Sequence, residues 1–197
     1  MLFLRILHDI TIMKKIFFIA ILLVSFSINA QEINWVTLED AVELQKTNPK
    51  KIMIDMYTVW CGPCKMLDKN TFHNKDVVDY INTYYYAVKF NAEGNDELTF
   101  SGKSFSNPNY KPEMAKRRNS PHQLTRYFKV TAYPSMVFID EDLKHLTTLR
   151  GYQNPQQLEL YLKLFKEDKH KAMDSQEKFN EYYKAFKPLF KGFELFK

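Results

Sequence analysis

The stretch that most constrains the fold of this chain is KIMIDMYT, residues 51–58, an apolar run that a single charge, Asp55, interrupts. A strand that is apolar on both faces needs cover on both faces, as in parallel sheets flanked by helices. A helical stretch is expected over residues 63–70, and YYYAVKF, residues 84–90, predicts the next strand. Strand, helix and strand form a crossover unit, which indicates an α/β fold.

The rest of the pattern extends this sheet and covers it with helices. Short strands are expected at INWVT and over residues 135–139 and 145–149. Helices are expected over 38–47, from Ser120-Pro121, and from Asn154-Pro155 to about Lys166. A last helix is expected from Asp174, where Asp174 and Glu177 suggest a capping box. We therefore expect a central sheet with helices on both faces.

The only two cysteines of the chain lie in VWCGPCK, between the apolar strand and the helix that follows it. Backbone N–H groups at a helix start favour a thiolate, so Cys61 occupies a nucleophile's position. Cys64 lies one turn further along the same helix face and can attack a mixed disulfide formed at Cys61. Gly62 allows a partner's backbone to approach closely, and Pro63 fits the first helical turn.

These residues resemble the thioredoxin superfamily, whose reducing members carry WCGPC. The resemblance covers about residues 51–166. It implies a thioredoxin fold, that is, a central mixed sheet flanked by helices, here with an inserted loop and an extra C-terminal helix.

Four positions outside the cysteine motif carry the resemblance further. Asp55, six residues before Cys61, matches a buried aspartate that takes part in proton transfer to the second cysteine, and Lys89 matches a lysine that contacts this aspartate. Tyr133-Pro134 matches a cis-proline that faces the disulfide, with the backbone before it pairing the substrate chain. Gly151 matches a glycine near the substrate groove. Substrate-binding residues are thus expected at Trp60, Gly62, Pro63, Tyr133, Pro134 and Gly151.

The resemblance implies an exported thiol–disulfide oxidoreductase that reduces protein disulfides and receives electrons from a membrane-embedded thiol donor. Its only cofactor would be the redox-active Cys61–Cys64 disulfide, and it would act as a monomer. Open alternatives are a disulfide oxidase or isomerase, a Cu(I) chaperone that uses the two sulfurs, and a partner-binding module with incidental thiols. No histidine lies at zinc-finger spacing from the cysteines, so no metal site is expected. The net charge of +5 is spread without a basic stripe, which argues against nucleic-acid binding.

Residues 1–30 predict a signal peptide that starts at Met13: Lys14 and Lys15 precede the apolar run IFFIAILLV, and Ala30 suits cleavage. A retained membrane anchor is the alternative. Export to the periplasm would leave a thioredoxin-like domain over 31–170 and a helical extension over 171–197.

An insertion over 95–118 departs from the family pattern. It reads as a solvated loop or as a recognition element, with Phe100, Phe105 and Tyr110 as anchors and Lys116, Arg117 and Arg118 as a basic rim. Near the C-terminus, the aromatic residues Phe179, Tyr182, Tyr183, Phe186 and Phe190 predict a face that packs on the core. His73 and His122 are expected to be ordinary surface or helix residues.

Overall fold

The computed structural model describes residue 14 and residues 32–192. The predicted signal peptide therefore lies, apart from Lys14, outside the described residues. Within the described part of the chain, no helix is both long and apolar enough to cross a membrane.

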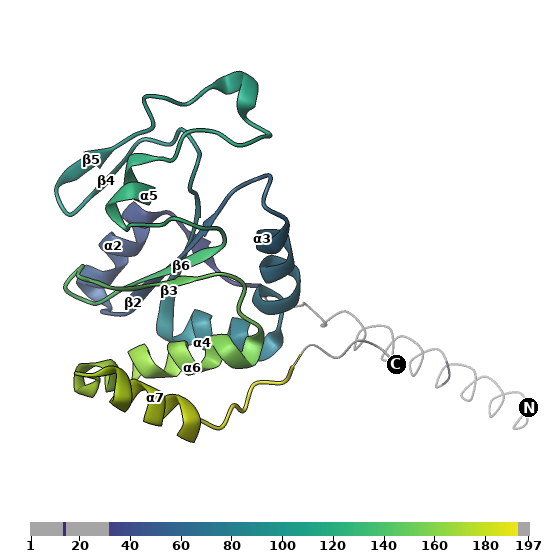
Figure 1. The fold of residues 1–197 in the computed structure, drawn as a ribbon, viewed down its shortest axis with the longest axis vertical. Coiled ribbons are helices and arrows are strands. Elements are labelled where there is room, and N and C mark those ends of the chain that lie inside the picture. The colour runs from purple at the N-terminus through teal and green to yellow at the C-terminus, as the bar shows by residue number, and fades with distance from the viewer. Residues whose placement is uncertain (1–13, 15–31, 193–197) are drawn as a thin grey trace, which may run out of the picture. The chain divides into compact units, whose positions relative to one another are not determined.

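A five-stranded mixed sheet forms the centre of the fold, as predicted (Figure 1). Its order is β1 (Trp35–Val36), β3 (Tyr85–Asn91), β2 (Lys51–Tyr57), β6 (Ser135–Ile139) and β7 (His145–Arg150). β1 and β2 both run parallel to β3, whereas β6 is antiparallel to β2 and to β7. The apolar strand β2 occupies the middle of the sheet, where both of its faces are covered.

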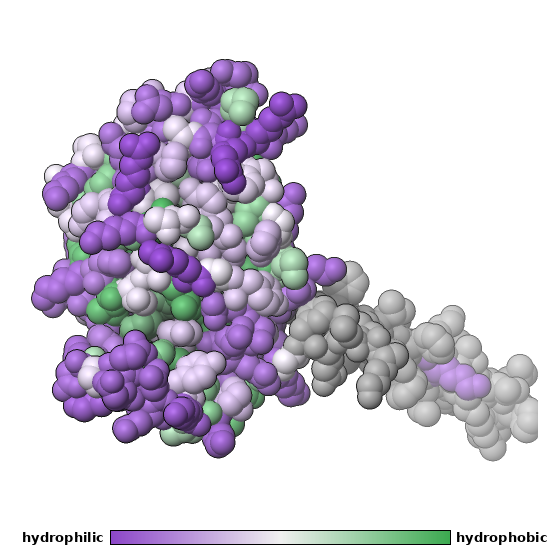
Figure 2. All heavy atoms as spheres, in the orientation of Figure 1, coloured by the Kyte–Doolittle hydropathy of each residue, from purple (hydrophilic) through white to green (hydrophobic). Residues whose placement is uncertain are grey.

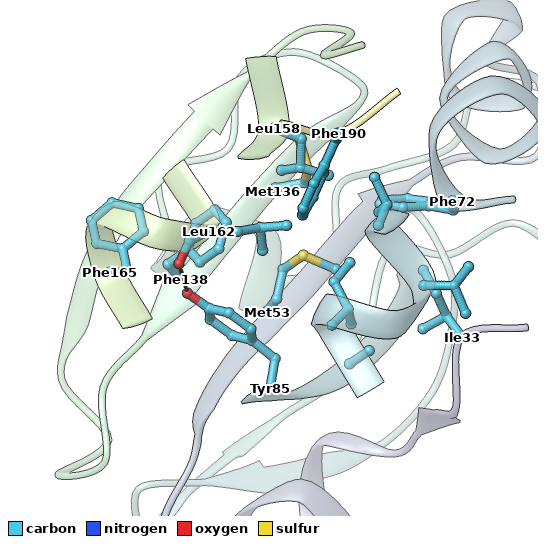
Figure 3. Close-up of a cluster of buried hydrophobic side chains, with 14 of the residues drawn as sticks. Ile33, Met53, Phe72, Tyr85, Met136, Phe138, Leu158, Leu162, Phe165 and Phe190 are labelled. Atoms are coloured by element: carbon cyan, nitrogen blue, oxygen red, sulfur yellow. Dashed lines mark hydrogen bonds between the residues drawn. The ribbon is translucent and has the colours of Figure 1, made fainter. Parts of the chain in front are cut away.

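One face of the sheet packs against α3 (Gly62–Leu67), α4 (Lys75–Tyr84) and α6 (Pro155–Lys166). Figure 3 shows Met53, Met136 and Phe138 of the sheet meeting side chains of α6. The buried Tyr85 hydroxyl donates a hydrogen bond to the Leu162 carbonyl at 2.6 Å, so its polar group is satisfied inside this core. Local sequence fixes the helix starts, because Asn74 caps α4 and Asn154 forms a capping box with Gln157.

The opposite face packs against α2 (Leu38–Thr47) and α5 (Gln123–Tyr127), together with part of the insertion. The insertion contains a hairpin of β4 (Leu98–Phe100) and β5 (Lys103–Phe105), with Ser101 and Gly102 both at positive φ in the turn. Phe100 and Phe105 are buried in this core. The alternative in which these two residues anchor a partner is therefore wrong, because the hairpin directs their side chains inward.

Two helix starts differ from the prediction. α5 begins at Gln123 and not at Ser120-Pro121, because the His122 N–H is bonded to the Ala92 carbonyl beyond β3. His122 is fully buried at the start of α5, so the surface alternative of its prediction is wrong and the helix alternative holds. Its Nδ1 accepts the Leu124 N–H and its Nε2 lies 2.8 Å from the Asp96 carbonyl, which makes it the N-cap. Burial lowers the pKa of this imidazole.

The C-terminal helix α7 (Gln176–Ala185) starts after Ser175, which accepts the Lys178 N–H. Asp174 instead pairs through its side chain with the Lys178 ammonium, so the predicted capping box is wrong. The predicted packing face is confirmed in part. Phe179, Tyr182 and Phe190 contact the core, whereas Tyr183 is 54% exposed. Phe190 lies beyond α7 and reaches the cluster drawn in Figure 3.

Candidate active site

The two cysteines form a disulfide at the junction between β2 and α3. Cys61 is the N-cap of α3, and its Sγ accepts the backbone N–H of Cys64 at 3.1 Å. Pro63 occupies the first turn, where its missing N–H costs no helical hydrogen bond. A negative charge on the Cys61 sulfur would therefore meet a backbone donor and the positive end of the helix.

Both sulfur-bearing residues are almost covered, with 2% of Cys61 and 6% of Cys64 exposed. By exposed fraction alone, Cys64 would be the more accessible cysteine. The walls of the neighbouring groove, however, include Cys61 and not Cys64. The groove lining therefore places Cys61, and not Cys64, beside open space.

The groove beside Cys61 has a volume of about 590 Å³ and three walls. The first wall is the cysteine motif, the second is the segment 130–133, and the third comes from the end of the insertion. The lining residues are Trp60, Cys61, Gly62, Pro63, Glu93, Arg118, Asn119, Pro121, Val130, Thr131, Ala132 and Tyr133. A Cβ added at Gly62 would meet nothing within 4 Å, so the groove is open to another backbone at this point.

Trp60 is held by a buried carboxylate that the sequence did not reveal. The Trp60 indole N–H donates to Glu93 Oε2 at 2.7 Å, and the Asn119 N–H donates to the same oxygen at 2.8 Å. Glu93 is only 6% exposed. It therefore joins Asn119, the residue directly after the insertion, to the residue that precedes the first cysteine.

The second wall, residues 130–133, ends directly before Pro134. The Tyr133–Pro134 bond is cis, as the resemblance implies. The Gly151 N–H donates to the Pro134 carbonyl at 2.8 Å, and Gly151 has φ +84°, a conformation that favours glycine. The Tyr133 ring meets Trp60 edge to face, with 6.0 Å between ring centroids. Burial raises the pKa of Tyr133 to about 12, with the nearby Glu93 charge adding to the effect.

Asp55 lies in β2, six residues before Cys61. Side chains alternate along a strand, so Asp55 shares the face of Met53, which α3 covers. The residue is 2% exposed, and its Oδ1 has no hydrogen-bond partner. Burial raises the pKa of Asp55 from 3.8 to about 7, against an opposing effect of the Lys89 charge.

Lys89 does not make the contact with Asp55 that the resemblance implies. The two residues are register partners on β2 and β3, but the Lys89 ammonium forms an ion pair with Asp68. Asp68 opens a π-helical turn, Asp68–Phe72, that continues α3. The ammonium also lies over the rings of Trp35 and Tyr57, at 5.3 and 5.7 Å from their centroids. These partners hold Lys89 at the edge of the site, and it acts on Asp55 only through its charge.

The structure thus separates the predicted site residues into two groups. The residues that line the groove are Trp60, Cys61, Gly62, Pro63 and Tyr133. The residues that do not line it are Asp55, Cys64, Lys89, Pro134 and Gly151. Sequence reasoning missed Glu93, Asn119 and Asp68. No local pattern marks them, because each acts on a residue that is distant in the sequence or lies across the fold.

A family model described as a thioredoxin-like domain matches residues 38–166. The thiol:disulfide interchange protein DsbD of Campylobacter jejuni (strain RM1221) is 33% identical over 61 residues, which are 31% of this chain and 11% of that protein. The match therefore spans only about a tenth of that relative.

Among solved structures, a thioredoxin-fold protein from Helicobacter pylori matches with a TM-score of 0.53 and 18% identity, over 70% of this chain and 82% of that one. A thioredoxin from Thermus thermophilus matches with a TM-score of 0.49 and 13% identity, over 68% and 87%. The first of these shows the fold. Because the family model also spans more than half of the sequence, this chain belongs to the thioredoxin-like domain family.

Proposed function

We propose that the protein reduces disulfides of other proteins through the Cys61–Cys64 dithiol. The observation that carries this proposal is the position of Cys61, whose sulfur accepts the Cys64 N–H at the start of α3 and borders an open groove. A thiolate is stabilised there and can be reached by another chain.

In the proposed reaction, the Cys61 thiolate attacks one sulfur of the substrate disulfide. A bond forms between Cys61 and that sulfur, and the other substrate sulfur leaves as a thiolate that takes up a proton. The Cys64 thiol then loses its proton and attacks Cys61, which forms the Cys61–Cys64 disulfide and releases the second substrate thiolate. The protein loses two electrons, and the substrate gains them.

Asp55 is the proposed acceptor of the Cys64 proton. Its pKa of about 7 makes the carboxylate available at neutral pH and strong enough as a base to take a thiol proton. Burial on the face that α3 covers supports this role. The positive charge of Lys89 lowers the Asp55 pKa and so opposes the effect of burial, which raises it.

The groove supports binding of an extended substrate segment. The backbone of Tyr133 would pair with the substrate chain, next to the cis bond to Pro134. Trp60 and Pro63 would contact the substrate side chains, and Gly62 leaves room for its backbone. Gly151, bonded to Pro134, would hold this wall in place.

The direction of electron flow, the donor and the location form the finer part of the proposal. The WCGPC sequence favours a reductase, which needs a thiol donor to reduce it again, and we propose a membrane-embedded one. The apolar run after Lys14 and Lys15 supports export to the periplasm. The similarity to a thiol:disulfide interchange protein supports the same class of partner.

The proposal is tested by turnover of a protein disulfide, such as those of insulin, with dithiothreitol as the electron source. The wild-type protein should accelerate reduction, and Cys61→Ser should abolish the acceleration. Equilibration with glutathione buffers tests the direction: a reductase should show a potential near that of thioredoxin, about −270 mV, and not near the −120 mV or so of the oxidant DsbA. A strongly oxidising potential would contradict the reductase role and favour the oxidase.

A further inference from the structure

Arg118, near the end of the insertion, lies directly beside the cysteine motif. Its guanidinium carbon is 4.7 Å from the centroid of the Trp60 ring, and both residues line the groove that contains Cys61. A guanidinium over an indole ring is attracted to its face. A cation from the insertion therefore has a defined place next to the attacking sulfur.

The segment that carries Arg118 is fastened to the site by hydrogen bonds. The neighbouring Asn119 donates its backbone N–H to Glu93 Oε2, the oxygen that also accepts the Trp60 indole. The Asn119 side chain closes the loop, because its amide bonds both the N–H and the carbonyl of Lys111, at 3.0 and 2.8 Å. Arg118 thus projects from a fixed backbone and not from a free loop.

Arg118 makes no ion pair with any residue of the described range 32–192. The buried Glu93 nevertheless lines the same groove. Glu93 Oε2 already accepts two N–H groups, those of the Trp60 indole and the Asn119 backbone. Stacking occupies the face of a guanidinium and leaves its N–H groups, which lie in the plane, free to bind. Arg118 itself is exposed.

The surface around Arg118 has the same sign of charge. Residues 111–118 contain Lys111, Lys116, Arg117 and Arg118 against a single acid, Glu113. Figure 2 shows a mostly hydrophilic surface over the insertion, at the top of the view. Phe100 and Phe105 are buried in the core, so Tyr110, which is partly buried, is the one predicted aromatic anchor left at the surface. Charged side chains are therefore the main groups that residues 111–118 offer to a partner.

We propose that Arg118 is a specificity residue that selects substrate chains with a carboxylate close to the cystine that Cys61 attacks. Arginine binds a carboxylate with two parallel hydrogen bonds, and Trp60 holds the guanidinium in place for this contact. The inference rests on the proposed disulfide reduction and names its substrate class. Acidic segments beside a disulfide would be reduced faster than neutral or basic ones.

The test uses two peptides that each carry one cysteine as a mixed disulfide with 2-thiopyridine and that differ only in a glutamate or glutamine next to the cysteine. The reduced protein attacks the peptide sulfur, and the released thiopyridone reports the rate constant. The wild-type protein should prefer the glutamate peptide by about fivefold at low salt, as expected for a charge-assisted pair near the surface, and the preference should shrink in high salt.

Arg118→Gln should remove this preference, and Arg118→Glu should transfer it to a peptide with lysine at the same position. Arg117→Gln is the matched control, because it loses the same charge from an exposed neighbour that does not line the groove. It should keep the preference. Three results would overturn the role of Arg118. The wild-type protein could show no preference for the glutamate peptide, Arg118→Gln could keep the full preference, or Arg117→Gln could lose as much of the preference as Arg118→Gln does. Failure of every variant and the wild type to react with either peptide would instead contradict the proposed function itself.

Discussion

Asp55 and Lys89 are register partners on neighbouring parallel strands, yet the Lys89 ammonium pairs with Asp68. Asp55 is left with a buried oxygen that has no hydrogen-bond partner. A carboxyl group in this position is easier to protonate, which explains the raised Asp55 pKa. The arrangement has consequences for stability and for catalysis.

Stability of the oxidised protein should fall as the pH rises, because of Asp55. The pKa of Asp55 is about 7 in the folded protein and 3.8 when unperturbed, so the folded state binds the proton more tightly. The stabilisation is complete below pH 3.8 and is lost as the pH rises through about 7. It amounts to about 4 kcal/mol at most. Urea unfolding at several pH values should show this loss in the wild type and not in Asp55→Asn. A difference between the two proteins that does not change with pH would contradict the assignment.

The two charges near Asp55 should shift its pKa in opposite directions. Lys89 lowers the Asp55 pKa and Asp68 raises it, so Lys89→Met should raise the value and Asp68→Asn should lower it. Infrared or carbon NMR titration of the Asp55 carboxyl group measures this directly. Lys75→Met, which removes an exposed lysine on α4, is the control and should leave the pKa of Asp55 unchanged. Shifts of equal sign in the two variants would show that the charges do not act as described.

Removal of the Asp55 carboxylate should slow the step in which Cys64 attacks the mixed disulfide. In Asp55→Asn we expect turnover about tenfold slower at pH 7, and a smaller effect near pH 9, where a thiol ionises without a base. Formation of the mixed disulfide should keep its rate. Stopped-flow measurements of the two steps separate these effects, and unchanged resolution at pH 7 would remove Asp55 from the mechanism.

The segment after α7 should contribute to the stability of the domain. Phe190 is 8% exposed in the core, and its N–H and that of Leu189 bond the buried Glu159 carboxylate. Phe190→Ala should lower the free energy of unfolding by about 3 kcal/mol, because it leaves a cavity. Leu189→Ala, at a residue that is 77% exposed, should change it little. Equal effects of the two changes would mean that the segment is not docked in solution.

Much of the fold could be predicted because its signals are local. The bounds of α2 and β6 agree with the prediction, and α6 was found from its cap and proline at Asn154-Pro155. The hairpin of the insertion was missed, although two alternating runs flank Ser101-Gly102, a pair suited to a two-residue turn. Burial of Phe100 and Phe105 depends on the sheet that the hairpin covers, and no local pattern contains that information.

The same distinction holds for the site. The cysteines, Asp55 and Tyr133-Pro134 could be located because a motif and its spacing mark them. Glu93 could not, since its hydrogen bond to Trp60 joins residues 33 positions apart. The partner of Lys89 was predicted wrongly for a related reason: strand register places it beside Asp55, but a long side chain can reach Asp68 on another element.

Trapping of the mixed disulfide tests the central claim most directly. Cys64→Ser, reduced and mixed with a disulfide-bonded protein, should accumulate a covalent complex, because the second thiol needed for release is absent. Mass spectrometry should locate the linkage at Cys61, and the matched Cys61→Ser variant should trap far less. Absence of any complex with Cys64→Ser, or preferential trapping through Cys64 in Cys61→Ser, would contradict the assignment of Cys61 as the attacking thiol of a disulfide reductase.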